Sequence, residues 1–263
     1  MIKALFTAST GLNAQQTVVD NTANNLANVN TNGFKKSQAD FQDLIYVNER
    51  VPGAVAAQGL QSPTGIQIGS GVRIAGTTKV FTQGGLVNTT NPLDVAIQGE
   101  GFFQLTLPSG ETRYTRDGAL RLNNVGNLVT SDGFLIQPQL TIPQSAVSVS
   151  IGSDGTVSVV NAGATNTSTL LGQLTLVRFQ NPAGLSAEGK NLLAESASSG
   201  APITATPGLN GTGLIQQGFQ ERSNVDVVSE LVNLIIAQRA YEFNTKVITT
   251  ANQMLLSTTS LIQ

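Results

Sequence analysis

The chain has 263 residues, a formal net charge of −2, and charged side chains at only 11% of its positions. A weak and mixed charge argues against nucleic acid or an anionic membrane surface as a partner, because both attract concentrated positive charge. Cys and His are absent, which excludes disulfides, the common zinc and copper sites, and Ser-His-Asp or Cys-His catalysis. This composition leaves open only metal sites built entirely from oxygen ligands. Together with the motifs described below, it leads us to expect no catalytic, cofactor-binding or metal-binding residues, and no enzyme activity.

Residues 1–34 are predicted to form an N-terminal helix with a heptad seam. Leu5, Leu12, Val19 and Leu26 follow one another at intervals of seven, which is the repeat of a coiled coil. The helix is expected to end at Asn32-Gly33, because glycine readily takes the left-handed conformation that follows a helix. The apolar run near the N-terminus is too short for a secretory signal, and the seam continues past any cleavage site.

Residues 35–76 are predicted to form an extended arm or a long hairpin. A second amphipathic stretch covers 36–46, and Gly and Pro then punctuate short alternating pieces such as 66–68 and 72–74. A flexible linker is the alternative, but alternation of apolar and polar residues is unusual in linkers.

Residues 77–218 read as a series of short strands with no helix between them. Asp-Gly pairs, a strong hairpin signal, occur at Asp117-Gly118, Asp132-Gly133 and Asp154-Gly155. This pattern predicts an inserted all-β domain with antiparallel pairing. Ser153-Asp154-Gly155 resembles a fragment of a calcium loop, but it lacks the companion acidic positions, so a hairpin turn is favoured.

Residues 219–263 contain neither Gly nor Pro and are predicted to form a C-terminal helix that starts near Asn224. Ser223 and Asp226 have the spacing of a capping box, and Glu242 stands four residues before Lys246, the favourable order for a pair. Such a helix would be roughly 55–60 Å long, too long for one domain of this size to cover. It also carries apolar residues on several faces, so it needs several partners. The fold class predicted for the whole chain is α+β, with both terminal helices in one coiled-coil-like layer.

Several long segments resemble bacterial flagellar rod and hook proteins, the axial protein family of the flagellum. The matching segments span nearly the whole chain: 24–35, 93–103, 114–118, 127–133, 223–226 and 237–242. The piece 66–72 is similar to the arm of distal rod subunits in particular. Hook proteins of this family are normally longer, and other rod subunits are generally smaller or lack the arm.

The resemblance implies a structural subunit that self-assembles into the distal rod, the drive shaft of the flagellar basal body. In such a tube the terminal helices surround a central export channel, the β domain forms the outer layer, and torque passes to the hook. Asn24, Asn25 and Asn28 would make amide contacts between subunits. The residues expected at the assembly interface are Leu5, Leu12, Val19, Leu26, Asn24, Asn25, Asn28, Leu231, Ile235, Gln238, Tyr241, Ile248 and Leu255.

The resemblance also implies partners and a location. The partners would be further copies of the chain, other rod proteins, the hook and the hook–rod junction, and the rings in the peptidoglycan and outer membrane. The subunit would pass through the flagellar type III export apparatus without a cleaved signal and end in a rod that spans the periplasm.

Other readings stay open from the residues alone. A hook or another rod subunit of the same family is one alternative, and a β-rich surface adhesin is another. Glu100, Glu111 and Asp117 lie near one another in the sequence and could suggest a carboxylate pair of a hydrolase. Acidic residues at hairpin turns are usually solvated, and the sequence gives no separation between the carboxyl groups with which to test that reading.

Overall fold

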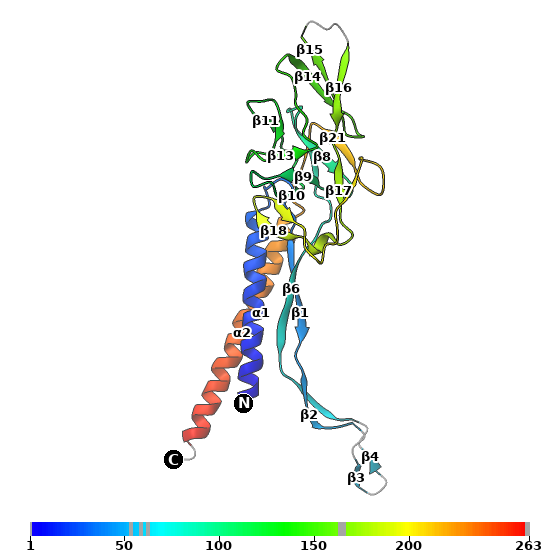
Figure 1. Ribbon diagram of the computed structural model, residues 1–263. Coiled ribbons are helices and arrows are strands. Elements are labelled where there is room, and N and C mark those ends of the chain that lie inside the picture. The colour runs from blue at the N-terminus through cyan, green and yellow to red at the C-terminus, as the bar shows by residue number, and fades with distance from the viewer. Residues whose placement is uncertain (1, 53–54, 58–59, 62–63, 163–166, 261–263) are drawn as a thin grey trace. The chain divides into compact units, whose positions relative to one another are not determined.

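The computed structural model describes residues 2–52, 55–57, 60–61, 64–162 and 167–260 (Figure 1). The chain divides into two compact units. The helical unit comprises 1–26, 37–78 and 226–263, and the β unit comprises 27–36 and 79–225. Terminal helices with an antiparallel β region between them confirm the predicted α+β class. Within the described residues, no helix is long and apolar enough to cross a membrane.

The two helices, α1 (Ile2–Ala27) and α2 (Val227–Ser260), lie side by side in the helical unit (Figure 1). α1 ends before the predicted Asn32, and turns lead from it to Gly33, whose φ of +68° is the expected left-handed conformation. α2 begins after the predicted Asn224, because the Asp226 carboxylate rather than Ser223 accepts the N–H of Ser229 at 3.3 Å and caps the helix. Residues 261–263 of the predicted helix lie outside the described residues.

Residues 37–79 form three nested strand pairs. β1 (Ser37–Asp43) pairs with β6 (Val72–Lys79), β2 (Tyr46–Arg50) with β5 (Ile66–Gly69), and β3 (Val55–Ala57) with β4 (Leu60–Gln61). The stretch 36–46 therefore holds β1 and the start of β2, and the chain returns along itself as a two-stranded hairpin (Figure 1). The predicted turn residues Gly53, Gly59 and Pro63 lie outside the described residues.

The core of the β unit lies on a seven-stranded sheet in the order β11-β12-β13-β9-β10-β19-β18. Its strands are β9 (Phe103–Thr106), β10 (Thr112–Thr115), β11 (Arg121–Leu122), β12 (Leu128–Val129), β13 (Leu135–Gln137), β18 (Ser186–Gly189) and β19 (Leu192–Ala194). A three-stranded sheet adds β14 (Ala146–Ile151), β15 (Thr156–Asn161) and β16 (Ser168–Gln173). Side chains from both sheets, such as Phe103, Leu105, Ile136, Val157 and Val159, share one apolar cluster.

Three further pairs complete the β unit. β17 (Leu176–Arg178) pairs with β20 (Ile203–Ala205), and β21 (Leu214–Gln217) pairs with β8 (Val95–Gln98). β22 (Phe219–Glu221) pairs with β7 (Leu86–Asn88) shortly before α2 begins. A single turn of 3-10 helix covers Pro182–Gly184.

The Asp-Gly hairpin signal is correct at two of its three positions. Asp132-Gly133 joins the paired strands β12 and β13, and Asp154-Gly155 joins β14 and β15. The Asp154 carboxylate accepts the N–H and hydroxyl of Thr156 at 3.1 and 2.7 Å, so it serves the turn that was favoured over a calcium loop. Gly99 and Gly101, both with positive φ, turn the chain between β8 and β9.

The hairpin predicted at Asp117-Gly118 is wrong. β10 and β11 on either side of it do not pair with each other; β10 pairs with β9 and β19, and β11 pairs with β12. Gly118 instead runs against β8, where its carbonyl accepts the N–H of Val95 at 3.0 Å. A Cβ at Gly118 would lie 1.6 Å from the Val95 carbonyl oxygen, so only glycine permits this approach.

We predict that Gly118→Ala destabilises the β unit by more than about 2 kcal/mol, because the clash is with backbone that cannot rotate away. Gly85→Ala is the matched control, since nothing lies within 4 Å of a Cβ placed there. Urea unfolding followed by circular dichroism measures both variants. Equal midpoints for the two variants would contradict this account of Gly118.

Candidate functional site

A buried charge cluster in the β unit joins residues that are far apart in the sequence. Glu221 at the end of β22 accepts a hydrogen bond from Lys35 Nζ at 2.6 Å through one carboxylate oxygen and from Arg116 Nε at 2.6 Å through the other. The three residues are only 2%, 4% and 6% exposed, respectively. Buried charges are tolerated when they are paired and their remaining hydrogen-bonding groups are satisfied.

Backbone groups satisfy the rest of the cluster. Glu221 also accepts the N–H of Gly84 at 2.9 Å, and Lys35 Nζ donates to the Thr82 carbonyl at 2.7 Å. Arg116 donates to the Gly101 carbonyl at 2.7 Å. Burial raises the pKa of Glu221, but the charges of Arg116 and Lys35 outweigh it, so the pKa of Glu221 lies below its usual value. The carboxylate is therefore ionised at neutral pH.

The cluster fastens together the two chain segments that lead to the helices. Beside it, the N–H of Gly33 donates to the carbonyl of Glu221 at 2.8 Å, and the Asn32 amide donates to Gln220 Oε1 at 2.6 Å. The Asn224 side chain accepts the N–H of Lys36 at 2.8 Å and donates to the Val80 carbonyl at 2.8 Å. The segment after α1 and the segment before α2 are thus joined within the β unit.

Asn25 plays a similar part in the helical unit. Its amide accepts the N–H of Ser37 and donates to the Ser37 carbonyl, each at 2.9 Å, and it donates to the Glu230 carboxylate at 3.4 Å. Asn25 and Glu230 are only 2% and 5% exposed. Asn25 of α1 therefore contacts both β1 and α2.

The other asparagines predicted at the interface differ in exposure. Asn24 is exposed, whereas Asn28 is half-buried and accepts the Thr31 hydroxyl at 3.1 Å. The amide of Asn25 is used inside its own subunit, so its contribution to an interface between copies would be to hold α1 and α2 in place.

The covered stripe of α2 is offset from the predicted one. In α1 the predicted seam, Leu5, Leu12, Val19 and Leu26, is half-buried. In α2 the covered residues are spaced by threes and fours: Glu230, Leu234, Ala237, Ala240, Asn244, Ile248, Ala251 and Leu255. The helices approach closely at Gly11, where an added Cβ would lie 3.0 Å from the Asn244 amide.

Leu231 and Ile235 do not lie on the covered stripe of α2. They are exposed in the subunit, as are Gln238 and Tyr241, because they follow the covered stripe by one residue and so turn about 100° away from it. Ile248 and Leu255 lie on the covered stripe. The predicted pair Glu242–Lys246 is also replaced, since Glu242 bonds with Arg239 at 2.9 Å.

The helices leave large apolar side chains in solvent. Ile2 and Phe6 of α1 are 65% and 69% exposed, and the exposed set on α2 is more extensive. Its members are Val227, Val228, Leu231, Val232, Ile235, Ile236, Tyr241, Phe243, Val247, Met254 and Leu256. Exposed apolar surface on this scale marks an interaction surface.

The carboxylates considered for hydrolysis lie in separate exposed or half-exposed pairs. Glu100 bonds with Arg178 at 2.8 Å and Glu111 with Arg113 at 2.9 Å. Asp117 accepts the N–H of Ala119 at 3.1 Å, and burial raises the pKa of Asp117. Among the described residues no group of acidic side chains is arranged to hold a metal ion.

Comparison with known proteins decides the family. Three family models match: the flagella basal body rod protein over 5–35, the flagellar hook protein FlgE/F/G D1 domain over 96–159, and the flagellar basal body rod FlgEFG protein C-terminal region over 216–261. Flagellar basal-body rod protein FlgG of Buchnera aphidicola is 50% identical over 97% of this chain and 98% of its own. FlgG of Caulobacter vibrioides is 48% identical over 99% of both chains, and FlgG of Bacillus subtilis is 40% identical over 97% of both.

The chain belongs to the FlgG family of flagellar basal-body rod proteins. This confirms the resemblance found in the sequence and the expectation of a structural protein rather than an enzyme. The three family models cover most of α1 with the turn after it, part of the core of the β unit, and β22 with α2. The charge cluster places one residue in the first of these regions, Lys35, one in the second, Arg116, and one in the third, Glu221.

Sequence reasoning missed this cluster. Lys35 and Arg116 stand inside the motifs that carried the resemblance, and charges are rare in this chain, so each is conspicuous. Nothing local links either of them to Glu221, which precedes the predicted helix and was not assigned a partner.

We predict that Glu221→Gln destabilises the β unit by about 3–5 kcal/mol, because it leaves Lys35 and Arg116 buried without their counter-charge. Replacing Lys35 by Met in the same variant should recover part of this loss. Glu100→Gln is the control, because its pair with Arg178 is exposed and should contribute within about 0–1 kcal/mol. Urea unfolding compares the four proteins, and an unchanged midpoint for Glu221→Gln would refute the role of the cluster.

The low pKa of Glu221 predicts an acid-sensitive contribution to stability. An unfolded glutamate titrates near about pH 4.3, above the folded value, so the contribution is complete above that pH and is lost as pH falls through the folded pKa. The free energy of unfolding should therefore decline more steeply below about pH 4.3 in the natural protein than in Glu221→Gln. Parallel pH profiles for the two proteins would show that Glu221 carries no such linkage.

Proposed function

We propose that this chain self-assembles into the distal rod of the flagellar basal body. In this proposal α1 and α2 of many copies pack as a coiled-coil-like layer around a central export channel, and the β units form the outer layer. The rod then transmits torque to the hook. Membership of the FlgG family supports this function, as does the arrangement of apolar residues on the helices.

The observation that carries the proposal is the apolar surface of α2. One helix, α1, covers only one stripe of it, while Val228, Ile236, Phe243 and Leu256 are 69%, 61%, 68% and 72% exposed on other faces. Each large apolar side chain gains about 1.5–3 kcal/mol when it is fully buried. Neighbouring copies of the same helices offer matching apolar faces, and packing against them would bury these side chains.

The hairpin 37–79 is proposed to act as an arm that reaches across neighbouring subunits. Outside 53–63, no side chain of this hairpin is buried, and Ile45, Tyr46, Val47, Ile66 and Ile68 are all exposed. Helices alone can slide along one another, so an arm lying across several copies would lock them axially. Such a lock suits a shaft that must resist bending.

The proposed partners follow from a place in the rod. They are further copies of the chain, other rod proteins, the hook and its junction with the rod, the surrounding peptidoglycan and outer-membrane rings, and the type III export apparatus. The proposed location is a rod that spans the periplasm. Electron microscopy of the purified subunit under assembly conditions tests the central claim, since a surface adhesin would form no tubes.

We predict that Leu231→Ala impairs rod assembly without destabilising the free subunit. Leu231 is 43% exposed in the subunit, so its truncation should change the unfolding free energy by less than about 0.5 kcal/mol. Between copies it would be buried, where truncation costs about 2–5 kcal/mol. Sedimentation measures rod yield, and Val125→Ala, an exposed change in the β unit, serves as control. A normal rod yield from Leu231→Ala would show that Leu231 is not part of the interface.

We also predict that deletion of residues 52–71 leaves a protein that assembles into tubes of lower bending stiffness. The helices that drive assembly are unchanged, whereas the axial lock is lost. Bending stiffness is obtained from the curvature of tubes in electron micrographs. Unchanged stiffness would mean that the hairpin is only a connection, and loss of all assembly would place it among the residues that drive polymerisation.

A further inference from the structure

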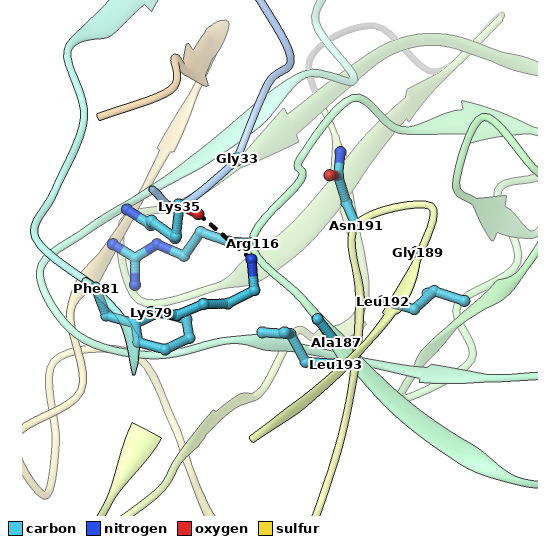
Figure 2. Close-up of a pocket in the computed structure, with 10 residues that line it drawn as sticks. All are labelled: Gly33, Lys35, Lys79, Phe81, Arg116, Ala187, Gly189, Asn191, Leu192 and Leu193. Atoms are coloured by element: carbon cyan, nitrogen blue, oxygen red, sulfur yellow. Dashed lines mark hydrogen bonds between the residues drawn. The ribbon is translucent and has the colours of Figure 1, made fainter. Parts of the chain in front are cut away.

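A small cavity in the β unit is lined by both cationic and apolar side chains. Its volume is about 80 Å³. The charged and polar side chains are those of Lys35, Lys79, Arg116 and Asn191, the apolar ones are those of Phe81, Ala187, Leu192 and Leu193, and Gly33 and Gly189 complete the lining (Figure 2). A water molecule takes up about 30 Å³ of liquid, so the cavity has room for a carboxyl group with one or two methylene groups.

Positive charge exceeds negative charge around this cavity. Lys35, Lys79 and Arg116 line it, and the carboxylate of Glu221 pairs with Lys35 and Arg116. Both oxygens of Glu221 are already engaged, one by Lys35 and Gly84 and the other by Arg116. Asp117 does not line the cavity; its carboxylate accepts the Ala119 N–H and is hydrogen bonded to the side chain of Asn191, which does line it.

Lys79 is the one cation lining this cavity that Glu221 does not pair with. Its ammonium donates to the Lys35 carbonyl at 3.4 Å, drawn in Figure 2, and lies 5.1 Å from the centre of the Phe34 ring. Neither group neutralises it, and no carboxylate of the described residues forms an ion pair with it. An ammonium carries three N–H groups, so most of its hydrogen-bonding capacity remains for a ligand. Burial lowers the pKa of Lys79, as expected for a cation without a counter-charge.

We propose that this cavity binds one aliphatic carboxylate, with the carboxylate on Lys79 Nζ and the aliphatic stem against Phe81, Leu192 and Leu193. The Lys79 ammonium would neutralise the ligand, and the apolar side chains would favour a ligand with a carbon stem over a bare inorganic anion. In a rod the carboxylate would come from an Asp or Glu side chain of an adjoining subunit. That last step rests on the proposed assembly, whereas the chemistry of the cavity does not.

The first experiment uses the full-length subunit before assembly and sodium acetate as the probe. Acetate replaces chloride at constant ionic strength while the side-chain NMR signals of isotope-labelled lysines are recorded. We expect a saturable shift of the Lys79 signal, identified by its absence in Lys79→Met, and no saturable shift of the exposed Lys246. Arg121→Met, which removes an exposed cation elsewhere in the β unit, should leave the Lys79 response unchanged. A Lys79 signal that moves only in parallel with Lys246 would overturn the proposal.

The second experiment separates the two sources of carboxylate. Lys79→Glu would place two carboxylates together, so rod yield should fall at least about tenfold, while Lys79→Arg should retain it. Circular dichroism of the free Lys79→Glu and Lys79→Met subunits checks that both fold. Normal rods from Lys79→Glu, together with a saturable acetate response, would support a site for small free carboxylates and overturn the subunit as source. If even the natural chain forms no rods, the proposed assembly fails, and the acetate titration still decides the cavity.

Discussion

The charge cluster of Lys35, Arg116 and Glu221 is the constraint on which the connection between β core and helices depends. The chain leaves the N-terminal helix at one end of the sequence and enters the C-terminal helix near the other, and both connecting segments must be held at the β unit. Glu221 holds them electrostatically, with Lys35 from the first segment and Arg116 from the sheet at 2.6 Å each. A buried carboxylate with two cations has few alternative partners, so this arrangement specifies one pairing of the segments. Its value lies in that specificity as much as in net stability.

Asparagine side chains also hold these connecting segments, by bonding to backbone groups that have no partner strand on that side. Asn224 accepts from Lys36 and donates to Val80, and Asn25 makes a reciprocal pair with the backbone of Ser37. In each case an amide replaces the partner strand that the backbone would otherwise need, because buried backbone groups must be hydrogen bonded. The N–H groups of the consecutive residues Lys36 and Ser37 therefore donate to side chains near opposite ends of the sequence.

This arrangement suits a subunit whose helices need neighbouring copies to bury their apolar faces. The β unit has a closed apolar core, and the cluster keeps its two connections together. The helices leave much of their apolar surface open, so the interactions that would complete them belong to the assembly and not to the free chain. Low charge overall fits this arrangement, since packed helices from many copies would repel one another if each carried a large net charge.

The sequence by itself determined what local patterns control. Heptad spacing and the absence of Gly and Pro indicated the two terminal helices, and Asp132-Gly133 and Asp154-Gly155 indicated their hairpins, because a short turn depends mainly on the backbone preferences of its own residues. Long motifs indicated the family. The tertiary structure decided every feature that depends on contacts between residues far apart in the sequence. Gly118 turns against β8 instead of making a hairpin, α2 exposes Leu231 instead of burying it, and Glu221 meets Lys35 and Arg116. Each depends on which distant segments pack together, and the conformational entropy of bringing them together is offset only when the unit that holds them folds.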